Sequence, residues 1–82
     1  MPKTKNHKIV EVTWVDPAEF SGWNGSEALA FQPSHCKSVG YLIHQTKKQI
    51  TLSDTIATDQ DQDYGACLVL PRGVVVSIKT VK

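Results

Sequence analysis

The sequence predicts a mainly β protein, a small five-stranded antiparallel barrel with one short helix between its first two strands. Three observations lead to this fold class: short segments rich in apolar and β-branched residues recur, turn residues separate them, and no long stretch shows a helical period. The five expected strands are residues 9–16, 36–45, 49–56, 66–70 and 74–81. We expect the sheet to close because closure limits the unpaired edges through which sheets aggregate.

The first expected strand alternates apolar and polar residues. Val10, Val12 and Trp14 fall on one face, which is the period-2 pattern of a half-buried strand. We therefore place Trp14 in the core. Pro17 ends the strand because proline has no N–H group for the ladder.

Residues 17–34 have a different texture, with glycines, prolines and aromatic residues, and form an insertion between the first two strands. Within it, residues 26–31 favour one or two helical turns, with Ser26 or Asn24 as the N-cap and Pro33 blocking extension. Such a short helix is not stable alone. We therefore expect one of its apolar neighbours to pack against the sheet: Trp23, Leu29 or Phe31.

The third expected strand follows a polar turn at residues 46–48 and again alternates. Its inward positions are Ile50, Leu52 and Ile56, and its outward positions are Gln49, Thr51 and Ser53. Residues 57–65 are acidic and polar and are typical of an exposed loop.

The last two expected strands are apolar at consecutive positions, in residues 66–70 and 74–76. Both faces of these strands therefore call for burial, whereas one face of a lone sheet should meet water. Burial against a neighbouring subunit is one explanation, and cover by the segment 17–34 is the other.

Length and composition bound the class of protein. We expect the 82 residues to form one domain, with residues 1–7 as a flexible N-terminus. The small core favours oligomerisation. The formal net charge of +1 argues against a general duplex-DNA coater. With no apolar run of about 20 residues and no signal-peptide segment, we expect a cytoplasmic protein that does not enter membranes.

Three short motifs occur in order from Val39 to the end of the chain: Gly40 with Leu42, Leu52 with Asp54, and Arg72-Gly73 with Val76. In this combination the chain resembles the Sm-like family of small barrels. The resemblance implies a bent five-stranded sheet preceded by a helix. It also implies a homo-oligomeric ring in which the fourth strand of one subunit pairs with the fifth of the next.

The turn between the second and third strands departs from that family. The family places an aspartate and a base-binding asparagine there, whereas this chain has Thr46-Lys47-Lys48-Gln49, with Gln49 nearest the asparagine position. The chain is also similar to small uncharacterised Sm-like proteins of tailed bacteriophages. That similarity rests on the segments 12–16, 22–23 and 71–73, and it implies a phage origin and action in the host cytoplasm.

The candidate ligand-binding residues lie mainly in two turns. Arg72 offers donors for a phosphate or carboxylate, and Gly73 beside it suits a tight turn with positive φ and close ligand approach. The alternative is an ordinary turn with a solvated arginine. Lys47 and Lys48 would form a basic rim on a ring, or else a solubilising turn. Trp23 is a further candidate, which stacks on a base or covers the barrel.

No catalytic, metal or cofactor site is expected. Asp59, Asp61 and Asp63 alternate, but the glycine and glutamate of a calcium loop are missing. Cys36 and Cys67 match no zinc spacing and have no evident base, so we interpret them as small buried residues.

Three functions remain open from the sequence. The first is a non-enzymatic Sm-like ring that binds RNA or a nucleotide through Lys47, Lys48, Gln49 and Arg72. The second is a phage counter-defence protein that sequesters a host nucleotide signal between subunits. The third is a structural or protein-binding module that docks a host protein through residues 17–34.

Overall fold

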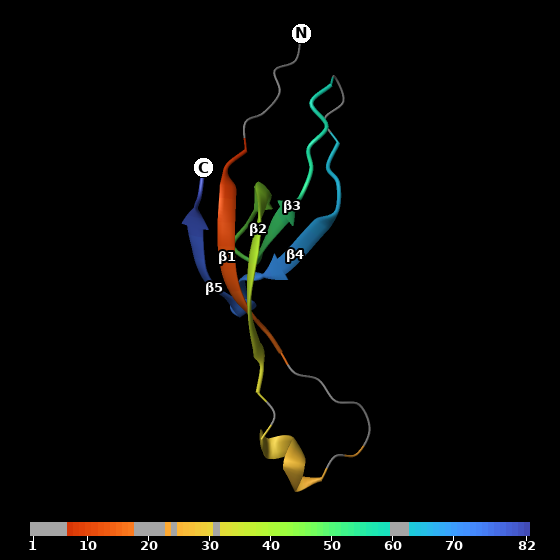
Figure 1. Ribbon diagram of the computed structural model, residues 1–82, viewed down its shortest axis with the longest axis vertical. Helices are drawn as coiled ribbons and strands as arrows, with labels where there is room; N and C mark the ends of the chain where they lie inside the picture. The colour runs from red at the N-terminus through yellow and green to blue at the C-terminus, as the bar shows by residue number, and fades with distance from the viewer. Residues whose placement is uncertain (1–6, 18–22, 24, 31, 60–62) are drawn as a thin grey trace.

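A computed structural model describes residues 7–17, 23, 25–30, 32–59 and 63–82 (Figure 1). Five strands and two 3-10 helices follow one another along the chain. They are β1 (Ile9–Asp16), η1 (Ser26–Ala30), β2 (Ser34–Gln45), β3 (Gln49–Ser53), β4 (Cys67–Pro71), η2 (Arg72–Val74) and β5 (Val75–Thr80). None of the helices in the described ranges is long and apolar enough to cross a membrane.

The strands form one antiparallel five-stranded sheet in the order β4-β3-β2-β1-β5. The mainly β prediction is therefore confirmed, but the sheet is open, and β4 and β5 are its two edges. The three residues of η2 connect β4 to β5, and β5 pairs with β1 at the opposite edge of the sheet. β4 pairs with β3, and β5 pairs with β1. Because β4 and β5 do not pair with each other, the sheet does not close into the expected barrel.

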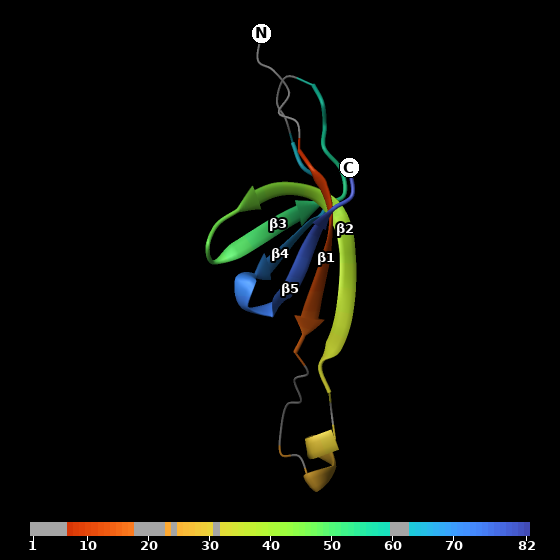
Figure 2. The ribbon, with the colours of Figure 1, turned by 90° about the vertical axis from the view of Figure 1, so that its left-hand side faces the viewer.

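The long strand β2 bends and pairs with a different strand at each end. Its first part pairs with β1 and its last residues pair with β3, with a register shift between Leu42 and His44. Figure 2 shows the strong curve of β2. Gly40 lies shortly before the register shift, and a Cβ atom there would come within 2.9 Å of the Ser53 carbonyl oxygen. A bulge and a glycine are the usual devices that let a strand bend.

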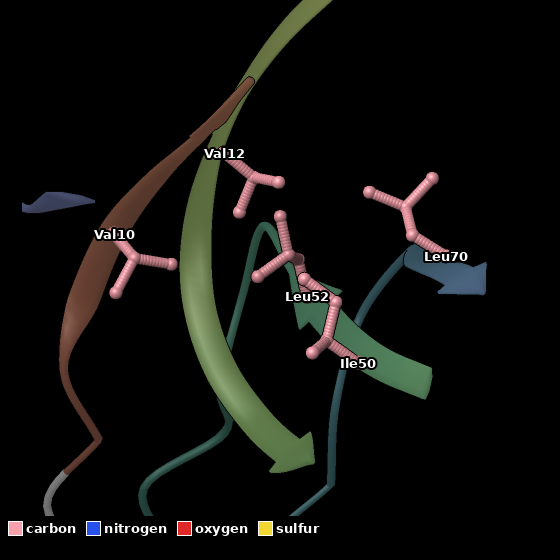
Figure 3. Close-up of a cluster of buried hydrophobic side chains, with 5 residues drawn as sticks. All are labelled: Val10, Val12, Ile50, Leu52 and Leu70. Atoms are coloured by element: carbon pink, nitrogen blue, oxygen red, sulfur yellow. The ribbon is translucent and has the colours of Figure 1, made fainter. Parts of the chain in front are cut away.

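The core is a cluster of five buried aliphatic side chains from β1, β3 and β4 (Figure 3): Val10, Val12, Ile50, Leu52 and Leu70. The alternation of β1 is thus confirmed. Trp14 packs against this cluster while half-buried, and its indole N–H donates to Ser38 Oγ at 3.0 Å. Burial of a ring with a paired N–H fits the amphipathic character of tryptophan.

The expected outward face of β3 is wrong. Thr51 and Ser53 are buried, at 9% and 1% exposure. β3 is enclosed between β2 and β4, so small hydroxyl side chains on it are covered by the neighbouring strands. The Ser53 hydroxyl donates to the Thr55 carbonyl oxygen at 2.8 Å, which satisfies it. The strand ends there, and Ile56 makes only an isolated bridge with Tyr64.

The described part of the β1–β2 connection, which we call the arm, lies beyond one end of the sheet (Figures 1 and 2). The molecule measures 61 × 24 × 20 Å. The described helix in the arm is the five-residue 3-10 helix η1. Leu29 is 86% exposed and Trp23 is fully exposed, so neither of these two candidates packs against the sheet. Phe31 and Asn24 lie outside the described residues. The described part of the arm also leaves Val69 and Val76 on the edge strands uncovered.

Candidate functional site

The β2–β3 turn is held in one shape by Thr46. Its backbone N–H donates to the Gln49 carbonyl oxygen at 2.8 Å, which closes the turn. Its hydroxyl oxygen accepts from the backbone N–H groups of Lys48 and Gln49, both at 3.1 Å. Threonine hydroxyls stabilise turns in this way. The turn therefore presents Lys47 and Lys48, both exposed, at a preformed tip.

Arg72 joins this turn from a distant part of the sequence. Its backbone N–H donates to the Lys48 carbonyl oxygen at 2.8 Å. Its Nε donates to the Thr46 carbonyl oxygen and one terminal nitrogen donates to Gln45 Oε1, each at 3.1 Å. The structure thus brings Arg72 together with the two lysines. Two of the guanidinium nitrogens donate to the protein, so Arg72 stabilises the turn. Its remaining N–H donors are left for a ligand.

Gly73 follows Arg72 in the chain, but the positive φ angle predicted for it is wrong. Its φ is outside the left-handed region, and a Cβ atom there would meet nothing within 4 Å. The residue belongs to the 3-10 turn η2, which any small residue fits. The space around Gly73 is open, so a ligand can approach it closely, as predicted.

Gln49 begins β3 at the foot of the turn and is exposed, opposite Pro71 in the ladder. Trp23 lies on the arm between β1 and β2, so the structure separates it from the turn cluster. Gln45 was missed at the sequence level, although it contacts Arg72. Its place directly before the turn is the one signal that could have found it. We call Gln45, Lys47, Lys48, Gln49 and Arg72 the turn cluster.

We expect Arg72→Met to lower the free energy of unfolding by about 1–2 kcal/mol, because two side-chain hydrogen bonds to the turn are lost. Lys47→Met is the matched control, and an exposed lysine should cost less than about 0.5 kcal/mol. Urea denaturation of both variants measures the difference. Equal midpoints for the two variants would show that these hydrogen bonds contribute nothing.

Each of the two thiols contacts a backbone carbonyl oxygen. Both cysteines are free. Cys36 is half-buried and its Sγ donates to the Ser34 carbonyl oxygen at 3.8 Å, while Cys67 Sγ donates to the Gly65 carbonyl oxygen at 3.1 Å. Cys67 is exposed on the edge strand β4, so its expected burial is wrong. Its position at the sheet edge explains the exposure.

The acidic loop between β3 and β4 holds no metal cluster among the residues placed by the structure. Asp59 and Asp63 are exposed, and Asp61 lies outside the described ranges. Comparison with known proteins supplies no further candidate, since no protein family, curated protein or solved structure matches the chain.

Proposed function

We propose that this chain is a non-enzymatic, Sm-like binding protein that self-assembles through the two edges of its sheet and binds RNA or a nucleotide at the turn cluster. The observation that carries the proposal is the open sheet. β4 and β5 each have one edge that no other described strand pairs.

The two edge strands carry exposed apolar side chains. Val69 on β4 is 51% exposed and Val76 on β5 is 62% exposed. An unpaired strand edge is a template for pairing with another chain, and natural proteins usually blunt such edges with charges or proline. A neighbouring copy that adds its β5 to β4 would satisfy the backbone groups of both edges and cover both valines. Repetition of this contact would generate a ring or a chain of copies.

The turn cluster supports the ligand part of the proposal. Lys47 and Lys48 are exposed on a turn whose backbone is hydrogen-bonded, and Arg72 lies beside them. In an assembly this cluster would repeat once per copy, so a local basic rim would form despite the net charge of +1. Single-stranded RNA suits such a rim because each phosphate contact releases counterions.

We expect Val76→Lys to convert an oligomer into a smaller species, because an ammonium group would lie in the contact between copies. Val39→Lys is the matched control, since Val39 is also a strand valine, is 61% exposed, and lies on the central strand β2. Light scattering on a sizing column gives the mass of each. A wild-type monomer at every concentration would overturn the assembly part of the proposal.

We expect Lys47→Glu/Lys48→Glu to abolish binding of a fluorescent oligouridine at low salt. In Lys47→Gln/Lys48→Gln, the slope of log K against log salt should fall by about 1.4, because two phosphate contacts to a single strand are lost. Lys37→Gln is the control, because Lys37 is exposed on β2, outside the turn cluster and outside both edge strands. Failure of the wild-type protein to bind at low salt would overturn the RNA part.

A protein-binding module is the second candidate, and the arm favours it. Trp23 and Leu29 are the most exposed large apolar side chains in the described chain. Exposed tryptophan is typical of the few residues that dominate protein interfaces. Trp23→Ala should leave oligouridine binding unchanged and abolish any host-protein contact made through the arm.

A further inference from the structure

A groove of about 590 Å³ opens where the beginning of β1, the last residues of β2 and the end of β5 meet. This volume is within the range of roughly 300–1,000 Å³ typical of small-molecule sites. The apolar part of its lining that a ligand can reach includes Leu42 and Ile78, which are half-buried and pack against the core. A floor of this kind takes an apolar ligand body.

The wall formed by residues 7 and 8 is fixed in place. The Leu42 backbone N–H donates to the Lys8 carbonyl oxygen at 2.9 Å. The His7 ring is held on both sides: Nδ1 donates to the Leu42 carbonyl oxygen at 3.1 Å, and Nε2 forms a hydrogen bond with the Tyr64 hydroxyl at 3.4 Å. The Tyr64 ring also meets the His7 ring edge-on, with centroids 5.7 Å apart. Because this wall is already held in place, ligand binding does not have to bear the entropy cost of ordering it.

The polar part of the lining includes several hydrogen-bond donors. Lys8 contributes an ammonium group and His44 an imidazole, and both are exposed in the groove. Gln45 Oε1 already accepts from Arg72, so the NH2 end of that amide is the one left for another partner. Of the described residues that line the groove, none is an aspartate or a glutamate. The groove is therefore complementary to an anion.

We propose that this groove binds a small organic anion whose phosphate or carboxylate group is held by Lys8, His44 and Gln45, with its apolar body on Leu42 and Ile78. This goes beyond the proposed function, because Lys8 and His44 are not part of the turn cluster. Gln45 is shared by the two sites, since it lines the groove and contacts Arg72.

The test is an NMR titration of the full chain with four probes: adenosine 5′-monophosphate, octanoate, adenosine and inorganic phosphate. We expect saturable amide shifts at Lys8, His44 and Gln45 with at least one of the first two probes. Adenosine and phosphate, which each lack half of the recognised chemistry, should bind at least about tenfold more weakly. Binding of the first probe alone identifies a phosphate ester, and binding of octanoate alone identifies a carboxylate.

Charge reversal then separates this site from the turn cluster. Lys8→Glu/His44→Glu should weaken binding of the active probe about 10- to 100-fold, because charge-assisted hydrogen bonds are lost. Lys47→Glu/Lys48→Glu and Lys37→Gln should leave the probe's affinity unchanged. If the glutamate variant is unfolded, Lys8→Met/His44→Gln serves instead. No saturable shift with either probe at millimolar concentration, or affinity that depends on Lys47 and Lys48 and not on Lys8, would overturn the proposal.

Discussion

Replacement of Ile50 by alanine should lower the free energy of unfolding by about 2–5 kcal/mol, the cost of deleting buried methyl groups and leaving a cavity. Ile50 is fully buried and lies on the interior strand β3, opposite Leu70 on β4 and Gln45 on β2. Small domains have total stabilities near the low end of about 5–15 kcal/mol. The substitution is therefore expected to remove a large share of the stability.

Urea denaturation at a fixed protein concentration measures this loss, since self-association would make the apparent stability depend on concentration. Val76→Ala is the matched control, because Val76 is 62% exposed. In a dissociated sample it should change the stability by less than about 0.5 kcal/mol. If Ile50→Ala were equally mild, Ile50 could not be part of a packed core.

Replacement of Gly40 by valine is expected to have the second large effect, a loss of at least about 1–3 kcal/mol from overpacking. The added Cβ atom would approach the Ser53 carbonyl oxygen to 2.9 Å and Leu52 Cβ to 3.4 Å. The closer of these atoms is backbone in the adjoining strand, so it gives way only if β2 and β3 separate. The curve of β2 would then be lost together with part of the core.

Gly73→Ala provides the control for this prediction. A Cβ atom at Gly73 meets nothing within 4 Å, so alanine should be neutral or stabilise the protein by about 0.4–1 kcal/mol through the unfolded chain. Thermal denaturation of the two variants side by side gives the comparison. A Gly40 variant with the midpoint of the wild type would mean that β2 does not approach β3 as described.

Local patterns predicted much of the sheet. The alternation at Val10 and Val12 placed β1 correctly, and Pro17 ended it as expected. The polar turn before β3 was also placed correctly, because turn chemistry is written in neighbouring residues. Such features depend only on residues that are close in the sequence.

The errors have a common origin in contacts between distant segments. The burial of Thr51 and Ser53 depends on β3 being enclosed by two neighbours. The hydrogen bond between Arg72 and Gln45 joins two turns that no local pattern connects. Leu29 was expected to pack against the sheet, but the arm carries it away from the core. Closure of the sheet was inferred from edge protection, which another copy of the chain supplies equally well.

The strand order also has a consequence for the time course of folding. β1, which is made first, lies between β2 and β5, and β5 is the last strand of the sheet to leave the ribosome. Val10 therefore waits for its partner Thr80 until almost all of the described chain has been synthesised. Pairings between such distant residues are slow to form because a long loop must close first. We expect nascent chains that stop before β5 to remain protease-sensitive, and to become resistant only after release of β5.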